Sequence, residues 1–357
     1  MTRCDIAVVG GGIAGAALAA ELAPHATVTI LESESLAGYH ATGRSAAFWS
    51  ETYGGPAIQP LTTASYDGLA PFLAPLGSLK LGRAEDAAAI DTFLAQFADS
   101  GVVLERCDPS TRLPGLRDEW VLGVWEPSCA YIDVAAVHAD ALARARRAGA
   151  ELWVDAGLRG ARRTGGGWQL ETARGPLAAS ILVDAAGAWA DAVAELAGAG
   201  PLGIQPFRRT MVQLVTDPPP PVGLSHVSHI RGSFYFKPEP GGRLWLSPHD
   251  ETLVVPHDVQ PEELDVAIAI DRFEHVVDWR VARVERRWAG LRSFAPDRLP
   301  VYGFAPGAPG FFWCAGQGGF GIQTAPAASR LAADLILGRA PAIDPAPYAP
   351  DRFTGVT

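Results

Sequence analysis

Three closely spaced glycines near the N-terminus constrain the fold of this chain more than any other feature. Gly10, Gly12 and Gly15 directly follow a strand-like apolar run at residues 6–9 and begin a helix-like segment, after which a second strand-like run ends at Glu32. In a βαβ unit such glycines allow a tight turn, close approach of a pyrophosphate and close helix packing, while the acid accepts hydrogen bonds from a ribose. The pattern predicts a dinucleotide-binding site, the alternative being a glycine-rich turn in an unrelated α/β fold.

The composition is that of a folded, acidic protein. The 357 residues are 48% hydrophobic and 19% charged, which is enough to bury one large core or two smaller ones. A formal net charge of -10 disfavours nucleic acid and anionic membranes as partners. The four cysteines lie far apart in sequence, so no metal site is expected and a reducing cytoplasm is favoured. No apolar stretch is long enough to span a membrane, and the glycines interrupt the N-terminal run that resembles a signal peptide.

Elements of the nucleotide-binding type occur at both ends of the chain. Late in the sequence, a strand-like run at 311–315 precedes a glycine-rich turn at 317–321 and a helix-like segment at 323–337. Between the ends, residues 57–72 are expected to form a helix and residues 206–290 alternate in the manner of strands. We predict a discontinuous α/β, Rossmann-like domain and an α+β substrate domain built on an antiparallel or mixed sheet. The predicted ranges are 1–50, 132–205 and 291–342 for the first domain, 51–131 and 206–290 for the second, and 343–357 for a C-terminal tail.

This spread of elements favours FAD as the dinucleotide. FAD is longer than one βαβ unit can cover, so a flavin fold needs late segments for the ribityl chain and ring. Five stretches then carry a family likeness: Gly10–Gly15, Gly38–Ala47, Asp184–Trp189, Trp288–Phe294 and Gln317–Gln323. Together they resemble the D-amino acid oxidase superfamily of FAD-dependent oxidoreductases, and within it the bacterial FAD-dependent D-arginine and D-amino acid dehydrogenases, over essentially the whole chain. The resemblance implies a glutathione-reductase type of FAD-binding domain.

The resemblance also implies which residues hold the flavin. Backbone donors dominate the stretch beside the pyrophosphate and ring, and the late glycine turn cradles the pyrimidine end. No attachment histidine or cysteine is evident, and Cys314 is expected to be a buried structural thiol, so FAD is predicted to bind non-covalently. The implied cofactor residues are Gly10, Gly12, Ile13, Ala14, Gly15, Glu32, Ser33, Thr42, Gly43, Arg44, Ser45, Ala46, Ala47, Leu158, Ala186, Gly187, Trp189, Arg292, Gly318, Gly319, Phe320, Gly321, Ile322 and Gln323.

A carboxylate clamp is the main requirement for an amino acid substrate, and a guanidinium meets it with two parallel hydrogen bonds. Arg209 and Arg292 match the clamp positions of the family, although surface or structural arginines are the plainer alternative. Tyr53 and Tyr235 match tyrosines that close over the substrate, the alternative being core aromatics. Gly319 matches a position whose carbonyl orients the substrate nitrogen. The implied catalytic set is therefore Tyr53, Arg209, Tyr235, Arg292 and Gly319, with Gln323 as a further polar contact.

The sequence departs from the D-arginine enzymes in the pocket for the substrate side chain. Phe48 replaces a histidine, Ser50 a threonine and Ser78 a side-chain-binding glutamate, while His226 and Ser228 replace an aliphatic pair. Losing a buried carboxylate removes the partner of a cationic side chain. A neutral or mixed side chain is therefore favoured and a cationic one ranks second. Glu51 and Glu85 are expected to be solvated surface acids, the alternative being partners of a cationic side chain, and Lys80 would suit an acidic side chain.

The predicted reaction is oxidative deamination of a D-amino acid to the 2-oxo acid and ammonia, with hydride transfer from Cα to flavin N5. It requires little acid–base machinery, and His40 and His226 are expected to be packed or solvated histidines. The alternatives are oxidation of a secondary amine such as sarcosine, oxidation of a 2-hydroxy acid, and a flavin-binding protein without turnover. The electron acceptor, whether oxygen, a quinone or another compound, stays open.

Overall fold

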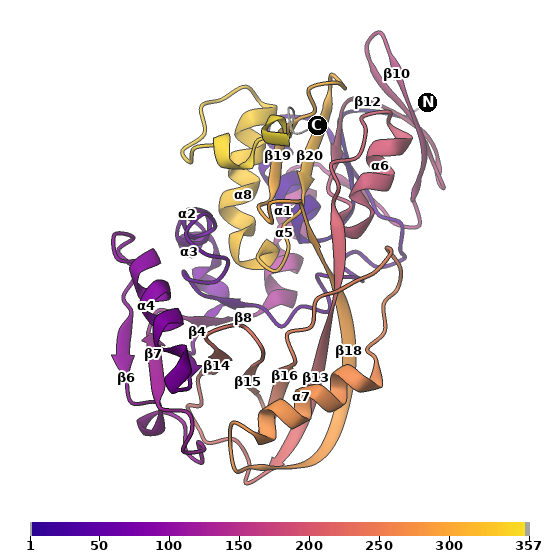
Figure 1. Cartoon of the computed structure of the whole chain (residues 1–357). Coiled ribbons are helices and arrows are strands. Elements are labelled where there is room, and N and C mark those ends of the chain that lie inside the picture. The colour runs from indigo at the N-terminus through magenta and orange to yellow at the C-terminus, as the bar shows by residue number, and fades with distance from the viewer. Residues whose placement is uncertain (1, 354–357) are drawn as a thin grey trace.

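The chain is organised around two large β-sheets, which occupy the upper and lower halves of Figure 1. The computed structural model describes residues 2–353. The first sheet has eight strands in the order β10-β11-β12-β1-β2-β9, with β20 pairing to β12 and β19 pairing to β20. Its strands are β1 Thr2–Val9, β2 Val28–Leu31, β9 Glu151–Trp153, β10 Leu158–Thr164, β11 Gly167–Thr172, β12 Gly175–Asp184, β19 Val301–Phe304 and β20 Phe311–Ala315.

Parallel pairing forms the centre of this first sheet. Strands β2, β1, β12 and β20 run parallel, and the hairpin of β10 and β11 adds antiparallel strands at one side. Helices α1 (Ile13–Leu22), α5 (Val134–Arg147) and α8 (Gly321–Ile336) lie together against it. The predicted βαβ unit with a late returning strand and helix is therefore present.

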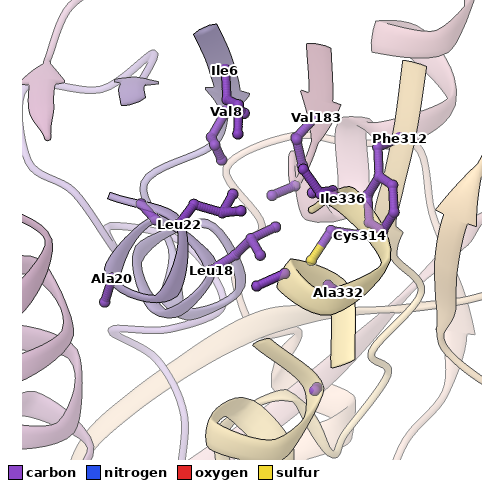
Figure 2. Close-up of a cluster of buried hydrophobic side chains, with 14 of the residues drawn as sticks. Ile6, Val8, Leu18, Ala20, Leu22, Val183, Phe312, Cys314, Ala332 and Ile336 are labelled. Atoms are coloured by element: carbon purple, nitrogen blue, oxygen red, sulfur yellow. The ribbon is translucent and has the colours of Figure 1, made fainter. Parts of the chain in front are cut away.

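Residues from both chain ends share one buried core. Figure 2 shows Leu18 of α1, Val183 of β12, Phe312 of β20 and Ile336 of α8 meeting between the two helices. Each fully buried aliphatic or aromatic side chain stabilises a fold by roughly 1.5–3 kcal/mol. Separating the N-terminal unit from the C-terminal one would lose several such contributions at once.

The second sheet has nine strands in the order β17-β13-β16-β15-β14-β5-β7-β6, with β18 pairing to β13. The pairing is mixed, because β14 and β5 run parallel while the other pairs run antiparallel. Helix α7 (Glu263–Glu274) packs against β13, β16 and β18. The strands are β5 Ser78–Gly82, β6 Glu105–Cys107, β7 Leu122–Glu126, β13 Gln205–Asp217, β14 His226–His229, β15 Tyr235–Glu239, β16 Arg243–Ser247, β17 Thr252–Leu253 and β18 Arg280–Phe294.

The segment between the two sheets contains the main difference from the sequence-based expectation. The helix-like stretch expected at residues 57–72 is helical but not continuous, because the chain forms two short helices and a 3-10 turn there. The Ser65 hydroxyl bonds to the Leu61 carbonyl at 2.7 Å, and Pro71 has no amide hydrogen to continue a helix. The remaining elements are α2 Gln59–Thr63, α3 Tyr66–Leu69, α4 Ala87–Gln96, α6 Ala190–Leu196 and the small sheet of β3 Phe48–Trp49, β8 Ala130–Ile132 and β4 Leu73–Pro75.

Two further predictions concern membrane-spanning helices and the ranges of the domains. None of the helices in residues 2–353 is both long enough and apolar enough to cross a membrane. The domain ranges given above stay a prediction. The boundary that they place after residue 290 falls inside β18, which runs without a break to Phe294.

Candidate active site

The glycine turn after β1 is the first part of the site. Gly10 has a φ of 107°, and a Cβ there would lie 2.4 Å from the Ala185 carbonyl oxygen. A Cβ on Gly15 would lie 2.0 Å from the Gly10 carbonyl oxygen, so neither position accepts a side chain. The Thr42 hydroxyl accepts a hydrogen bond of 3.0 Å from the Ile13 amide, which ties its loop to the start of α1. The helix start is therefore a cradle of the kind that binds phosphate.

Glu32 follows β2 and lies beside the glycine turn. It is 8% exposed and accepts hydrogen bonds of 2.9 Å from the backbone amides of Gly11 and Glu34. These bonds fix the carboxylate at the carboxyl edge of the parallel strands. A carboxylate in this position suits the hydroxyls of a ribose.

A cavity of about 530 Å³ joins the glycine turn to segments from late in the chain. Most predicted cofactor residues line it, whereas Gly15, Phe320 and Gln323 do not, and Gly43 and Ala47 line a second cavity of about 620 Å³ instead. The cradle, the carboxylate and the late glycine turn fit an extended dinucleotide. The predicted residues that line the first cavity are Gly10, Gly12, Ile13, Ala14, Glu32, Ser33, Thr42, Arg44, Ser45, Ala46, Leu158, Ala186, Gly187, Trp189, Arg292, Gly318, Gly319, Gly321 and Ile322.

The side chain of Arg44 is engaged within the protein. Its guanidinium pairs with Asp258 and donates to the carbonyls of Val259 at 3.0 Å and Ala289 at 3.2 Å. The Arg44 carbonyl accepts a hydrogen bond of 3.0 Å from the Trp288 indole. This arginine therefore anchors the loop to the second sheet, which agrees with the expectation that backbone groups dominate here.

The two predicted clamp arginines lie on one face of the second sheet. Phe207 of β13 pairs with Arg292 of β18, and two residues further along β13, Arg209 pairs with Gly290. Because side chains alternate along a strand, Arg209 and Arg292 point to the same side. Arg208 points to the opposite side, where it bonds to Asp265 at 2.8 Å and to Glu262. The pairing of β13 and β18 therefore separates a structural arginine from a site arginine.

Arg209 is held rigidly but keeps one free nitrogen. Its Nε donates to the Asp250 carbonyl at 2.8 Å and its Nη2 to the Glu251 carboxylate at 3.0 Å. Its Nη1 is buried and has no hydrogen-bond partner among residues 2–353. Burial and the nearby charge of Arg292 lower the pKa of Arg209 to about 10, so the group stays cationic at neutral pH. An unpaired buried donor beside a second guanidinium is a fitting partner for an anion.

Tyr53 and Gly319 surround Arg292. The Arg292 Nη1 donates to the Tyr53 hydroxyl at 2.7 Å, and both groups lie against the backbone of Gly319. Tyr235 lies across the site, where its hydroxyl bonds to the Met211 sulfur at 3.0 Å. The first cavity is lined by Arg209, Tyr235, Arg292 and Gly319, whereas Tyr53 reaches it only through its contact with Arg292.

The lack of a side chain at Gly319 is expected to matter for turnover. In Gly319→Ala, the Cβ would lie 2.3 Å from the Tyr53 hydroxyl and 3.0 Å from the Arg292 Nη1. We expect Tyr53 to be displaced and kcat/KM to fall about 100-fold, because small misplacements of positioning groups cost that much. Steady-state kinetics on the FAD-loaded variant measure this. Gly307→Ala, which meets no atom within 4 Å, is the matched control, and an equal loss in both variants would contradict the prediction.

The residues predicted for the side-chain pocket divide into two groups. Phe48 packs against His226 with ring centroids 4.1 Å apart and ring planes 34° apart, and the His226 Nδ1 lies 3.0 Å from the Ser78 hydroxyl. Ser228 is half-buried and pairs with Tyr235 across β14 and β15. These four side chains therefore form one cluster next to the two tyrosines, although none of them lines the first cavity.

Ser50 and Gln323 form the second group, and they form hydrogen bonds with other groups of the protein. The Gln323 amide donates to the Tyr53 carbonyl at 3.0 Å and to the Thr62 hydroxyl at 2.9 Å, and its oxygen accepts from the Ser50 amide at 3.3 Å. Gln323 is only 2% exposed. The predicted direct polar contact of Gln323 with substrate is therefore replaced by a role in holding the chain that carries Tyr53.

Glu126 is a buried carboxylate that sequence reasoning missed. It is fully buried on β7 and accepts hydrogen bonds from the Ser50 hydroxyl at 3.0 Å, the Thr52 hydroxyl at 2.6 Å and the Glu51 amide at 2.9 Å. Only strand pairing reveals it, because it lies opposite Ser78 across β5 and β7. It is not free to bind a cation, since three neutral donors already satisfy it.

The two acids proposed for this pocket do not face it, whereas Lys80 lies on β5 beside Ser228. Glu51 accepts a hydrogen bond of 2.7 Å from Thr63, and Glu85 is exposed in a short 3-10 helix. Lys80 lies over the Phe93 ring at 5.1 Å. His40 pairs with Glu34 at 2.9 Å and is therefore engaged, as expected of a packed histidine.

His249 is a second residue that the sequence did not single out. It has a φ of 57°, its Nδ1 donates to the Gly232 carbonyl, and its ring lies 5.8 Å from that of Tyr235. Non-glycine residues in the left-handed region are uncommon and concentrate at functional sites. Burial, together with the charges of Arg209 and Arg292, lowers the pKa of His249 to about 2. The imidazole is therefore neutral beside the arginine pair.

The depressed pKa of His249 predicts a loss of stability in acid. The unfolded chain binds a proton near the ordinary histidine pKa while the folded chain does not, so stability is complete above that value and falls as pH drops toward 2. The loss is at most about 1.4 kcal/mol per pH unit. His249→Asn, which tolerates the left-handed backbone, should flatten the dependence of unfolding free energy on pH between about pH 5 and 7. Exposed His257→Asn is the control, and parallel curves for both variants would contradict the assignment.

Comparison with known proteins places this geometry in a family. A family model described as "FAD dependent oxidoreductase" matches residues 5–335. The chain is 27% identical to a glycine oxidase from Geobacillus kaustophilus in an alignment of 376 positions that covers 99% of this chain and 98% of that protein. Its crystal structure superposes with a TM-score of 0.86 at 26% identity, covering 98% of each chain. An L-proline dehydrogenase from P. horikoshii shares the fold, with a TM-score of 0.87, 22% identity and coverage of 99% and 98%.

Two further matches to glycine oxidases are partial. The one from Pseudomonas aeruginosa is 51% identical over 63 residues, which is 18% of this chain and 17% of that protein. The one from Pseudomonas putida is 30% identical over 196 residues, which is 52% of this chain and 49% of that protein. The predicted fold class, a Rossmann-like FAD-binding domain with a mixed-sheet substrate domain, is confirmed. With a family model that spans most of its length, the chain belongs to the FAD-dependent oxidoreductases of the D-amino acid oxidase type.

Proposed function

We propose that this enzyme oxidises the carbon–nitrogen bond of a small α-amino acid, either glycine or a D-amino acid with a small uncharged side chain. The products would be the 2-oxo acid and ammonia. The observation that carries the proposal is the pair of guanidiniums, buried Arg209 and half-buried Arg292, on one face of the sheet and on the wall of the first cavity. The narrower resemblance to D-arginine dehydrogenases stays a hypothesis, since the relatives described above are named glycine oxidases.

Some residues of the site bind the substrate carboxylate, and others orient the substrate or the binding residues. The unpaired Nη1 of Arg209 and the guanidinium of Arg292 bind the substrate carboxylate, which fixes Cα against the cavity wall. Tyr53 holds Arg292 in place, and the Gly319 carbonyl accepts a hydrogen bond from the substrate nitrogen. The chemistry that bound FAD would supply at this site is acceptance of the hydride from Cα. Water then hydrolyses the imine product, so the chain itself contributes mainly position and charge.

A secondary amine such as sarcosine is the second candidate. The supporting observation is that a mouse dimethylglycine dehydrogenase is 27% identical over 98% of this chain, although the match covers 44% of that longer protein. A 2-hydroxy acid is less well supported, because its hydroxyl proton calls for a base and Phe48 stands where the basic residue of related enzymes was expected.

The cysteines support non-covalent FAD and a reducing compartment. All four are unpaired, and Cys314, next to the late glycine turn, is 3% exposed with a pKa raised to about 12 by burial. Such a thiol is a poor nucleophile for attaching a flavin. Acid precipitation should release all flavin into the supernatant, whereas flavin retained in the protein pellet would show a covalent link. We propose a cytoplasmic enzyme on the same grounds.

Anaerobic mixing of the purified yellow protein with candidate substrates tests the proposed function. Glycine, sarcosine and D-alanine should bleach the absorbance of the oxidised flavin, and L-amino acids and 2-hydroxy acids should leave it unchanged. Bleaching by L-amino acids alone would reverse the proposed stereochemistry. A flavin that none of these compounds reduces would contradict the assignment to amino acid oxidation.

A further inference from the structure

Phe48 occupies a central place behind the clamp. Its ring is 5.2 Å from that of Tyr53, 6.4 Å from that of Tyr235 and 4.1 Å from that of His226. Tyr53 is bonded to Arg292, and Tyr235 lines the cavity with both arginines. Phe48 therefore packs against both tyrosines and His226 while lying outside the first cavity. A substrate side chain that passed between the two tyrosines would meet the phenyl ring.

A polar pair lies directly beneath the Phe48 ring. His226 is 2% exposed, and its Nδ1 is 3.0 Å from the hydroxyl of Ser78, which is fully buried. The His226 Nε2 is buried and has no hydrogen-bond partner in the described part of the chain. Burial and the nearby Lys80 and Lys237 lower the pKa of His226 well below its ordinary value, so the ring is neutral. A buried polar atom without a partner is costly, and cases in native proteins call for an explanation.

The surroundings of this pair are polar, with the cations Lys80 and Lys237 and the carboxylate Glu126 close to it. Ser78 lies opposite Glu126 on the neighbouring strand, and that carboxylate is satisfied by three neutral donors. Lys237 pairs with Glu239. A side chain that reached His226 would find one unpartnered nitrogen among groups of both charges, which suits an uncharged hydroxyl or amide.

We infer that Phe48 determines the side-chain specificity of the enzyme by closing a polar compartment formed by His226 and Ser78. The inference rests on the proposed function and deepens it. With the ring in place, the compartment is shut, and the site takes glycine, N-methylglycine or D-alanine. Without the ring, the compartment opens and selects D-amino acids with short, uncharged polar side chains.

The test compares wild-type enzyme with Phe48→Ala and with Phe48→Ala/His226→Leu. The substrates are glycine, D-leucine, D-serine and D-2-aminobutyrate, the last of which is the apolar isostere of D-serine. Wild type should favour glycine over the other three. Phe48→Ala should raise the kcat/KM ratio of D-serine to glycine by about 10- to 200-fold, the range that small changes of pocket volume produce. Phe48→Ala should also raise the kcat/KM ratio of D-2-aminobutyrate to glycine, because the pocket is larger. The double variant should keep this increase for D-2-aminobutyrate but lose the preference for D-serine over it.

Two controls separate specificity from folding. Phe304→Ala removes an exposed phenylalanine from β19, away from both cavities, and should leave every ratio unchanged. Phe48→Leu keeps an apolar cover of smaller size, should give an intermediate shift, and serves if the alanine variant does not retain FAD. An active wild type that oxidises D-leucine as efficiently as glycine, or unchanged ratios in the Phe48 variants, would overturn the inference alone. A wild type whose bound flavin is reduced by none of these substrates overturns the proposed function and the inference with it.

Discussion

Replacement of Arg292 by methionine is expected to reduce kcat/KM by about 10²- to 10⁴-fold, corresponding to roughly 3–5 kcal/mol of lost binding in the transition state. Arg292 is half-buried on the cavity wall, and the hydrogen bond that its side chain makes within residues 2–353 is the 2.7 Å contact with Tyr53. The variant removes the charge that would hold the carboxylate and leaves Tyr53 without its donor. Most of the loss should appear in KM, since the carboxylate is bound before and during the reaction.

Two comparisons make the Arg292 result specific. Arg292→Lys keeps the charge but loses the planar fork, so it should recover only part of the loss. Arg287→Met removes a guanidinium from the same strand at a position that is 51% exposed at the side chain, and should leave kcat/KM unchanged. Flavin content must be equal in all proteins. If Arg292→Met retained wild-type KM for glycine, the arginine pair would not be a carboxylate clamp.

The second large effect is expected from Gly10→Ala, which should abolish FAD binding. Its Cβ would lie 2.4 Å from the Ala185 carbonyl oxygen, and the φ of 107° is one that alanine rarely adopts. The backbone conformation alone costs roughly 1–3 kcal/mol, and the overlap between β1 and the loop after β12 adds a further cost of about 1–3 kcal/mol. The turn must therefore shift, and the phosphate cradle shifts with it.

The ratio of flavin to protein absorbance in the purified variant measures this effect, and thermal unfolding with and without added FAD shows whether the cradle still responds. Gly166→Ala is the matched control, because that glycine lies in the turn of the β10–β11 hairpin with no atom within 4 Å of a new Cβ. A Gly10→Ala protein that purifies yellow with full flavin content would show that this turn does not hold the cofactor.

The order and type of the elements at both chain ends could be predicted from sequence, although β1 begins at Thr2, four residues before the expected start. The helix-like segment that begins at the glycines is α1, and the strand expected at 311–315 is β20, because buried apolar runs bounded by glycine leave little choice of element. The 57–72 segment could not be predicted in the same way. Its helical pattern is broken by Ser65 and Pro71, whose effects depend on local hydrogen bonds.

The site was predictable as a set of residue types but not as an arrangement. Arg208 and Arg209 are neighbours in sequence, and only the register of β13 against β18 shows which one faces the cavity. Glu126 carries no sequence signal, because a single acid at a strand end is usually exposed. The packing of Phe48 against His226 joins residues far apart in the chain, and such contacts follow from tertiary packing.

The shared core of the two chain ends bears on how the protein is made. Strand β20 begins about 300 residues after β1 ends, yet the two strands flank β12 in one sheet and α8 covers α1. At roughly 5–20 residues per second, a ribosome leaves the apolar surface of α1 without its final partner for on the order of 15–60 s. During synthesis the cofactor cradle lacks the late glycine turn. We therefore expect FAD to bind only after the chain is complete. Nascent and truncated chains are accordingly the forms that depend on chaperones and that aggregate first.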